Sequence, residues 1–286
     1  MLTMLLQLLL FALWAPLVNG VIKATKARLQ RRVGPPIWQP YRDLMKLFRK
    51  QMVISGSATW LFHGAPYVHA GATAAAALLV PSVPALQRGG DFLLLIGMLA
   101  LSRFVLALAA LEPGSAFGGM GSSREMAVSA FVEPALLVTL GAFIVIGTGS
   151  GPGRLLAAAA LVIITVAETG RVPVDNPDTH LELTMIHEGM VLEYSGPYLG
   201  LIAWSHDVKQ LIMLTLLANL ALPVGLFGQI WLALPVYLVK TLLLGVLLAF
   251  IETGMAKVRI LKIPDLLITA TALSALAALS GLPLGR

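Results

Sequence analysis

The chain consists of long apolar runs that are separated by short polar breaks. Each run is apolar over about the 20 residues that an α-helix needs to cross the hydrocarbon core of a bilayer. The runs lie at 1–22, 65–86, 92–111, 126–148, 154–170, 208–227, 230–251 and 263–283. This pattern predicts an all-α, polytopic membrane protein with about eight transmembrane helices. Since no fixed-period repeat or low-complexity linker divides the sequence, we expect residues 1–286 to form a single integral membrane domain.

The composition supports this fold class. Of the 286 residues, 58% are hydrophobic and 12% are charged, whereas a soluble domain is about 45–50% apolar and about 25% charged. A soluble core, a disordered chain and a disulfide-stabilised scaffold are therefore excluded. The first apolar run has no basic residue ahead of it and positive charge behind it, so we expect a transmembrane helix there rather than a cleaved signal peptide.

The sequence contains no cysteine. Iron–sulfur clusters need thiolate ligands, and structural zinc sites usually do. We therefore expect no redox centre and no metal site in this chain. Any electron transfer linked to it would take place in a partner protein.

Basic residues are concentrated in the first polar loop, residues 23–64. Its segment 23–50 carries nine Lys or Arg against one Asp, a net charge of +8. Lys and Arg accumulate in cytoplasmic loops, so this loop is predicted to be cytoplasmic and the N-terminus to lie outside. Eight spans then place the C-terminus outside as well. The net charge of +6 for the whole chain thus indicates orientation in a membrane rather than binding to nucleic acid.

A second polar loop, residues 168–207, has the opposite charge. It carries seven Asp or Glu against Arg171, a net charge of −6. The same span count places it on the cytoplasmic side, so the two loops should attract each other. One interpretation is a solvated charged rim, which is the usual fate of charge runs. The other is a folded platform on which another subunit binds, and the apolar residues between the acids favour it.

The acidic loop contains a helix signal. The segment from Thr179 to Glu182 matches a capping box, and the helical spacing of apolar residues continues to about Tyr194. This pattern predicts a short amphipathic helix on the membrane face, between the fifth and sixth spans. Its histidines, His180 and His187, would lie about 10 Å apart along the helix axis, too far to bind one metal ion.

Three ionisable residues lie in the middle of predicted spans, namely Arg103, Glu133 and Lys240. A charged side chain at the bilayer centre costs roughly 2.5–3.5 kcal/mol, so it normally faces a partner or a water-filled cavity. The alternatives are a static buried ion pair or a proton path that runs from the acidic loop into the membrane through Glu133. Residues near cytoplasmic span ends, where snorkelling or capping is the alternative role, are Glu112, Glu168, Lys209 and Glu252.

Residues 112–125 form a glycine-rich segment. It lacks the Lys-Ser/Thr ending of a phosphate-binding loop and follows a predicted membrane helix rather than a strand. We expect its glycines to allow a tight turn, with Ser122 or Ser123 capping the next helix. The sequence carries no other catalytic motif, and we expect no catalytic residue in this chain.

Several short motifs resemble those of a known family. They are Arg32-Val-Gly-Pro, Gln39-Pro-Tyr-Arg-Asp and Lys46-Leu in the first loop, and Glu193-Tyr-Ser-Gly at the end of the acidic loop. Together they resemble the membrane-anchor subunit family shared by respiratory complex I, as its subunit 1, and the group 4 membrane-bound hydrogenases. The resemblance covers nearly the whole chain, including the eight-span layout.

Two longer strings are similar to the hydrogenase branch of this family, which includes hydrogenase-4 component C and formate hydrogenlyase subunit 4. They are Gly114-Ser-Ala-Phe-Gly-Gly-Met-Gly-Ser-Ser-Arg-Glu-Met and Glu168-Thr-Gly-Arg-Val-Pro-Val-Asp. The complex I branch has Asn-Arg-Ala-Pro-Phe-Asp in place of Gly-Arg-Val-Pro-Val-Asp. This difference weighs against a quinone site, because hydrogenases of this type can pass electrons to protons instead.

The resemblance implies a role for the chain. It would be a non-catalytic subunit of an oxidoreductase, the membrane anchor and proton-coupling subunit of a group 4, formate hydrogenlyase-like NiFe-hydrogenase in a bacterial or archaeal plasma (inner) membrane. The expected partners are the hydrogenase large and small subunits, an iron–sulfur subunit, antiporter-like membrane subunits and the lipid bilayer. Iron–sulfur clusters and a nickel–iron centre are expected in those partner subunits and not in this chain.

The resemblance and the buried charges together imply two sets of site residues. Those expected to take part in proton coupling are Arg103, Glu112, Glu133, Glu168, Glu182, Glu188, Glu193 and Lys240. Those expected to dock other subunits are Arg31, Arg32, Gln39, Arg42, Asp43, Lys46, Arg171 and Asp175.

Two other interpretations stay open. One is the quinone-module subunit 1 of complex I, in which quinone would label the first and acidic loops. The other, from a different class, is a stand-alone secondary ion transporter with its site near Arg103, Glu133 and Lys240. Transporters often consist of paired halves, and the sequence shows no internal duplication, which favours the anchor subunit.

Overall fold

A computed structural model describes residues 2–56, 58–80, 82, 91–147, 151–176, 185–221 and 230–281. Every regular element among these residues is helical, which confirms the all-α prediction. The elements are α1 (Leu2–Leu29), α2 (Gln39–Arg49), α3 (Trp60–Leu79), α4 (Phe92–Leu111), α5 (Ala116–Ile146), α6 (Pro152–Glu168), α7 (His187–Val191), α8 (Gly196–Ala221), α9 (Ile230–Gly254), the short 3-10 turn η3 (Ile260–Lys262) and α10 (Ile263–Gly281).

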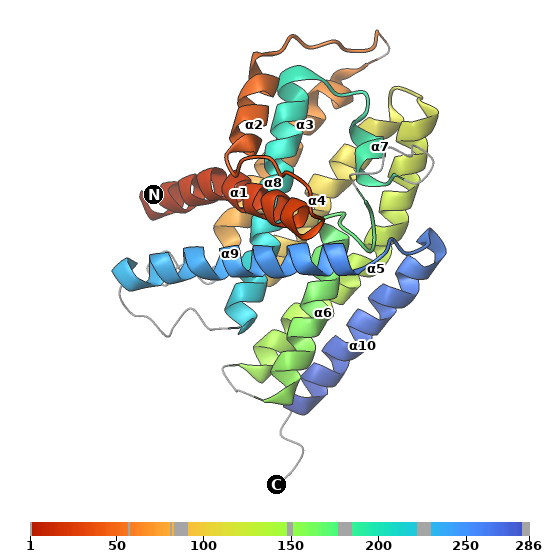
Figure 1. The fold of residues 1–286 in the computed structure, drawn as a ribbon. Helices are drawn as coiled ribbons and strands as arrows, with labels where there is room; N and C mark the ends of the chain where they lie inside the picture. The colour runs from red at the N-terminus through yellow and green to blue at the C-terminus, as the bar shows by residue number, and fades with distance from the viewer. Residues whose placement is uncertain are drawn as a thin grey trace.

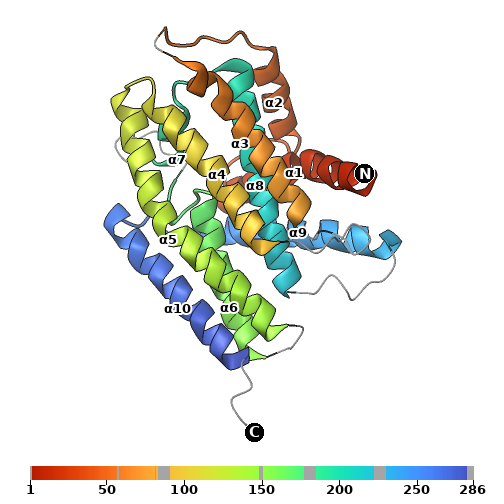
Figure 2. The ribbon, with the colours of Figure 1, turned by 180° about the vertical axis from the view of Figure 1, so that it is seen from behind.

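The helices run in two directions that cross (Figures 1 and 2). An inclined bundle contains α3, α4 and α8 together with α5, α6 and α10, and α10 packs on both α5 and α6. α1 and α9 lie side by side across this bundle. The short helices α2 and α7 pack on α8 and α5, respectively. The crossing of α1 and α9 over α8 brings three parts of the sequence that are far apart to the same central region.

The centre of the bundle is packed with apolar side chains from α1, α5, α6 and α8. Phe11, Ile22, Leu136, Leu161 and Ile212 are each at most 2% exposed. Many leucines and phenylalanines on the outer faces of the helices are instead exposed, among them Leu9, Phe104, Leu137, Leu243 and Phe250. An apolar exterior is expected where the surrounding solvent is lipid.

Five helices are long and apolar enough to cross a membrane, by length and composition. They correspond to Thr3–Leu29, Phe92–Leu111, Ala116–Ile146, Ala233–Gly254 and Ile260–Gly281. The chain is therefore a membrane protein, as the hydropathy pattern predicts. The other three predicted spans are covered, in their described parts, by α3, α6 and α8.

Some predicted boundaries agree with the structure and others do not. The span predicted at 92–111 coincides with α4, and the one predicted at 230–251 begins with α9. The start predicted at 126 is wrong, because α5 already begins at Ala116. The far ends of the spans predicted at 65–86 and 208–227 lie outside the described residues.

The expectation that Ser122 or Ser123 caps the fourth span is also wrong. The cap of α5 is Ser115, whose side-chain oxygen accepts a hydrogen bond from Gly118 N at 3.2 Å. Ser122 lies inside the helix and donates to Ala107 O on α4 at 2.8 Å. The glycine-rich segment therefore forms the expected tight turn at Gly114, whose φ is 68°, and continues as the first turns of α5.

The glycines of this segment let α5 approach its neighbours. A Cβ atom on Gly118 would lie 2.3 Å from Ala110 O at the end of α4. A Cβ atom on Gly121 would lie 3.0 Å from the backbone of Gly189 in α7. Real Cβ contacts are longer than these distances, so the close packing of α4, α5 and α7 requires glycine at both positions.

The predicted helix of the acidic loop is only partly described. Its predicted start at Thr179 lies outside the described residues, and α7 ends at Val191, earlier than predicted. Asp175 explains where α7 begins, because its Oδ2 accepts hydrogen bonds from Ile186 N at 3.1 Å and from His187 N at 3.2 Å. A carboxylate from a preceding segment thus binds the free N–H groups at the start of this helix.

The two loops of opposite charge meet through hydrogen bonds. Ser195 Oγ accepts from Val53 N at 2.9 Å and donates to Val53 O at 2.8 Å. Acids of the second loop pair with cations from other parts of the chain, for example Asp175 with Lys257 at 2.9 Å. Among the described residues, the two loops therefore contact each other mainly through hydrogen bonds rather than through ion pairs.

Candidate functional site

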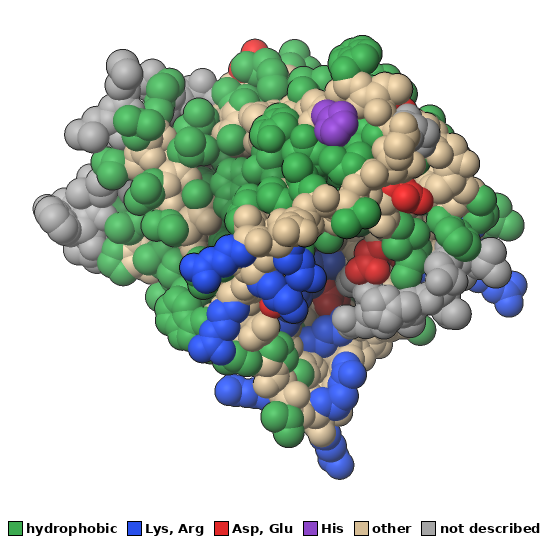
Figure 3. Space-filling model, turned by 90° about the horizontal axis from the view of Figure 1, so that it is seen from above, with side chains coloured by type: hydrophobic (Ala, Val, Ile, Leu, Met, Phe, Trp, Pro, Cys, Tyr) green, Lys and Arg blue, Asp and Glu red, His purple; other side chains and the backbone are tan. Residues whose placement is uncertain are grey.

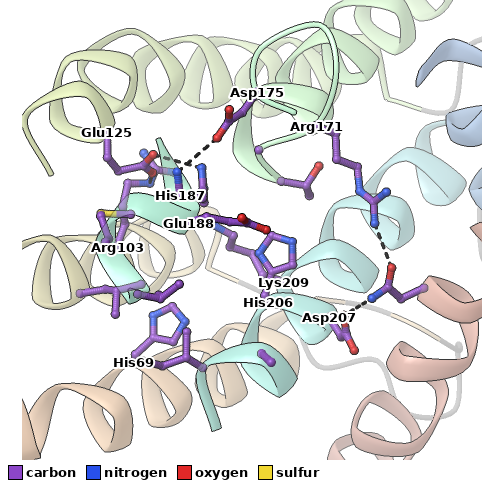
Figure 4. Close-up of a pocket in the computed structure, with 18 of the residues that line it drawn as sticks. His69, Arg103, Glu125, Arg171, Asp175, His187, Glu188, His206, Asp207 and Lys209 are labelled. Atoms are coloured by element: carbon purple, nitrogen blue, oxygen red, sulfur yellow. Dashed lines mark hydrogen bonds and ion pairs between the residues drawn. The ribbon is translucent and has the colours of Figure 1, made fainter. Parts of the chain in front are cut away.

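A partly open cavity of about 330 Å³ lies where α1, α4, α5 and α8 meet the segment that follows α6. Its wall carries ten ionisable acids and bases and three histidines. They are Lys23, Lys26, Arg103, Glu125, Arg171, Asp175, Glu188, Asp207, Lys209, Glu252, His69, His187 and His206. Figure 4 shows these side chains converging from several helices, and Figure 3 shows a recess in which basic and acidic side chains gather. Such a wall inside a membrane protein normally serves ions, protons or a polar ligand.

Arg103, in the middle of α4, binds three carboxylates. Its Nε lies 3.2 Å from Glu125 Oε1, and its Nη1 lies 3.4 Å from Glu133 Oε1. Its Nη2 donates to Glu168 Oε2 at the end of α6. Arg103 is only 5% exposed. Because a buried arginine is costly unless it is paired, these three acids explain how a guanidinium is tolerated at this depth.

Lys209 completes this group of charges. Its Nζ lies 3.6 Å from Glu168 Oε1, and both side chains are buried. We call Arg103, Glu125, Glu133, Glu168 and Lys209 the Arg103 cluster. It contains three carboxylates and two cations, so it becomes neutral when one carboxylate holds a proton. Low dielectric disfavours net charge, so this excess of one carboxylate makes the cluster a candidate for holding a proton.

A second group of polar side chains surrounds Arg171. Its Nη1 lies 2.6 Å from Glu252 Oε1 on α9, and its Nη2 donates to Asn19 Oδ1 on α1 at 3.1 Å and to Gln210 Oε1 on α8 at 2.7 Å. Asn19 Nδ2 in turn donates to Asp207 Oδ1 at 2.6 Å. We call Asn19, Arg171, Asp207, Gln210 and Glu252 the Arg171 cluster.

The two clusters share backbone elements. Lys209 and Gln210 are neighbours on α8, and Glu168 and Arg171 flank the turn that ends α6. Gly170 in this turn has a φ of 57°. A Cβ atom there would also lie 2.7 Å from His187 Nδ1. The glycine therefore allows one tight turn to supply a carboxylate to one cluster and a guanidinium to the other.

His187 is the first residue of α7, and its side chain lies beside the Arg103 cluster. Its Nδ1 lies 3.4 Å from Glu125 Oε2, and its ring centroid lies 6.2 Å from that of His206. Burial lowers the pKa of His187 below its usual range, although the nearby Glu125 carboxylate acts in the opposite direction. The imidazole is therefore neutral near pH 7.

Glu133 opens the Arg103 cluster to the outside of the bundle. Its side chain is 39% exposed. It lies with Arg103 in an open groove of about 430 Å³ between α4 and α5, whose other lining residues are Ala100, Leu101, Phe104, Met126, Ser129 and Ala130. Because Arg103 lines both the cavity and this groove, the guanidinium forms the partition between them.

The structure separates the other residues expected to take part in proton coupling. Glu188 lines the cavity from α7, but Glu112 binds the backbone ahead of α3, and Glu193 is exposed. Lys240 lies on α9 and is not among the described residues that line the cavity or the groove. Glu182 lies outside the described residues.

The residues expected to dock other subunits fall into two environments. Those of the first loop and α2 lie at or near the surface, namely Arg31, Arg32, Gln39, Arg42, Asp43 and Lys46. Arg171 and Asp175 are instead buried, 8% and 3% exposed, and connect elements of this chain. Docking by any of these residues stays a prediction.

Sequence patterning misses four residues of the two clusters. Glu125 lies outside the span predicted at 126–148, although its spacing of eight residues from Glu133 places both on one face of a longer helix. Asn19 and Gln210 carry no charge and so do not stand out in a search for buried ions. Asp207 falls in the predicted acidic loop, because the start of α8 is polar.

Comparisons with known proteins agree with this architecture. A family described as NADH dehydrogenase matches residues 2–281. The chain is 34% identical to hydrogenase-4 component C of Escherichia coli, over 95% of this chain and 92% of that protein. It is also 34% identical to formate hydrogenlyase subunit 4 of Escherichia coli, over 88% of this chain and 89% of that protein.

A solved structure shares the fold. It is a chain of the membrane-bound sulfane sulfur reductase, an archaeal respiratory membrane complex. The two chains superpose with a TM-score of 0.84 at 22% identity, and the match covers 98% of this chain and 99% of the other. The helix arrangement described above therefore occurs in a subunit of a membrane complex.

Proposed function

Because the chain belongs to the NADH dehydrogenase family, we propose that it is the membrane-anchor and proton-coupling subunit of a group 4, formate hydrogenlyase-like NiFe-hydrogenase complex. The two relatives at 34% identity carry the names of hydrogenase subunits, which favours this branch over a quinone-reducing complex. The chain has no cysteine for an iron–sulfur or nickel–iron centre. Those centres would be held by the large, small and iron–sulfur subunits.

The Arg103 cluster is the observation that carries the proton-coupling role. Arg103 and Lys209 face three carboxylates, of which Glu125 lines the cavity, Glu168 is buried beside it and Glu133 is exposed to the outer groove. A proton that moves through this cluster to Glu133 passes from the cavity to the groove without any large displacement of the chain. The direction and timing would be set by charge changes in the subunits that carry the electrons.

The membrane layout follows from the same assignment. The eight helices α1, α3, α4, α5, α6, α8, α9 and α10 would cross the membrane, with both termini outside and the basic and acidic loops in the cytoplasm. The membrane would be the plasma membrane of a bacterium or archaeon. The cytoplasmic arm would dock on the first loop, near Arg31 and Arg32, and an antiporter-like subunit would cover the groove beside Glu133.

The assignment is tested by identifying what the full chain assembles with in its native membrane. The chain is tagged at its C-terminus, purified in mild detergent and subjected to native mass spectrometry and metal analysis. We expect a large subunit with bound nickel, iron–sulfur subunits, and hydrogen formation by the purified complex. Recovery with a quinone-reducing module that lacks nickel, or ion uptake by the chain alone in liposomes, would contradict the assignment.

A further inference from the structure

The amphipathic helix α2 presents a row of cations that the proton-coupling role does not use. Arg42, Lys46, Arg49 and the following Lys50 recur at helical spacing and are all exposed. With Met45 they line a shallow surface groove of about 450 Å³. The acid of this helix, Asp43, accepts a hydrogen bond from Gln39 at 2.8 Å instead of pairing with the row.

Apolar side chains lie directly beside these cations. Met45 is 53% exposed and Phe48 is 49% exposed, both on α2 itself. Trp38, which precedes the helix, is 59% exposed, and its ring centroid lies 5.9 Å from that of Tyr41. Cations next to exposed aromatic and apolar groups are typical of helices that lie at a membrane surface.

α2 is held firmly against the helices of the bundle. Tyr41 Oη donates to Leu13 O in α1. On the other side, Gly200 of α8 approaches so closely that a Cβ atom there would lie 3.2 Å from Leu47 Cβ. Figure 1 shows α2 beside the first turns of α8. The row of cations therefore has a fixed position relative to the membrane-spanning part of the chain.

Exposed aromatic residues indicate the level at which α2 lies. Trp60 and Tyr67, on the first turns of α3, are 83% and 61% exposed. Trp and Tyr concentrate at the boundary between lipid headgroups and acyl chains. α8 packs on both α2 and α3, and Figures 1 and 2 show α2 at the same end of the bundle as these turns, which places its cations near the level of lipid phosphates.

From this juxtaposition we propose that the face formed by Arg42, Lys46, Arg49 and Lys50 binds the headgroup of an anionic phospholipid, whose acyl chains lie against Met45 and Phe48. Phosphate oxygens accept charge-assisted hydrogen bonds, and one guanidinium group can donate two such bonds to a single phosphate. The row extends from Arg42 to Lys50, nine residues, or about 12 Å along the helix axis. This length matches a headgroup with two phosphates, as in cardiolipin, better than a headgroup with one.

The main test compares two triple variants of the intact complex. R42Q/K46Q/R49Q removes the row, and R28Q/R259Q/K262Q removes the same number of exposed Arg and Lys elsewhere. The complexes are placed in nanodiscs of phosphatidylcholine with either cardiolipin or phosphatidylglycerol. They are then released from the nanodiscs and analysed by native mass spectrometry. We expect the first variant to retain at least tenfold less cardiolipin than the wild type and the second to match the wild type. Equal retention by both variants would overturn the proposal.

A second measurement keeps the row of cations intact. A photoreactive amino acid at Met45 should label cardiolipin in preference to phosphatidylcholine, and added inorganic phosphate should not reduce the labelling. Labelling of a cytoplasmic subunit instead would show that the face binds a protein, and labelling without preference for the anionic lipid would also contradict the proposal. The lipid site does not depend on the hydrogenase assignment, because both readouts measure bound lipid and neither measures activity.

Discussion

The carboxylate of Glu133 lies 3.4 Å from the guanidinium of Arg103, and the two residues differ in the spaces that they line. Arg103 is buried and lines both the central cavity and the groove between α4 and α5, whereas Glu133 is 39% exposed and lines the groove. This pair therefore connects the buried charges with the exterior of the bundle. It makes Glu133 the last carboxylate of this chain on a path from the cavity to the groove.

Glu168 and Glu133, two carboxylates of the Arg103 cluster, should differ in how much they contribute to the stability of the fold. Glu168→Gln leaves Arg103 and Lys209 short of a buried partner and should cost about 3–5 kcal/mol. Glu133→Gln should cost less, because Glu133 is only partly buried and Arg103 keeps Glu125 and Glu168 as partners. Thermal inactivation of the purified complex measures both. Equal losses would show that Glu133 is as deeply buried as Glu168.

The Arg171 cluster should behave as a structural clamp between α1, α8 and α9. Arg171→Gln leaves Glu252 without its 2.6 Å partner and removes the hydrogen bonds to Asn19 and Gln210. We expect a loss of about 3–5 kcal/mol and reduced assembly of the complex. The exposed Arg259→Gln should change stability by less than about 0.5 kcal/mol. The yield of assembled complex and its melting temperature distinguish the two variants.

The glycine contacts at the start of α5 offer a matched pair of substitutions. Gly118→Ala places a Cβ atom 2.3 Å from Ala110 O, so α4 and α5 must separate, at a cost of about 1–3 kcal/mol. Gly119→Ala adds a Cβ atom with nothing within 4 Å and should raise helix stability by about 0.5–1 kcal/mol. Melting temperatures of the two variants should therefore shift in opposite directions. A loss of similar size from Gly119→Ala would contradict the assignment of the cost to the contact between position 118 and Ala110 O.

The buried imidazole of His187 should make stability depend on pH. Its pKa is lowered by burial, so the unfolded chain binds a proton at a higher pH than the folded chain does. The neutral form then stabilises the fold above about pH 6.5, and this stability is lost as the pH falls below that value. Melting temperature should drop less steeply between about pH 7 and pH 5 in His187→Gln than in the wild type. An unchanged slope in His187→Gln would contradict the assignment of this pH dependence to the buried imidazole.

Sequence patterning predicts the helices far better than their contacts. Hydropathy locates α4 and the start of α9 to the residue, because a membrane helix must be apolar along its length. It misplaces the start of α5, since glycine and serine normally mark a turn, whereas here Gly118 and Gly121 are needed for close packing. The amphipathic helix α2 is also missed, because its charges resemble those of a solvated loop.

The candidate site is predicted only in part, for a physical reason. A charge within an apolar run must be paired or solvated, so Arg103 and Glu133 stand out in the sequence. Their partners depend on how helices cross, and only the structure shows that Glu125 and Glu168 reach Arg103 while Lys240 lies on α9. Uncharged members such as Asn19 have no such signal.

The central claim is that a proton passes through the Arg103 cluster to Glu133. The most direct test is the number of protons translocated per hydrogen molecule formed, measured in liposomes that contain the intact complex. Glu133→Gln keeps the shape of the side chain and removes its titration, and the exposed Asp265→Asn serves as the matched control. We expect Asp265→Asn to retain the wild-type ratio and Glu133→Gln to lower the ratio at least tenfold with normal assembly. A wild-type ratio in Glu133→Gln would contradict the claim.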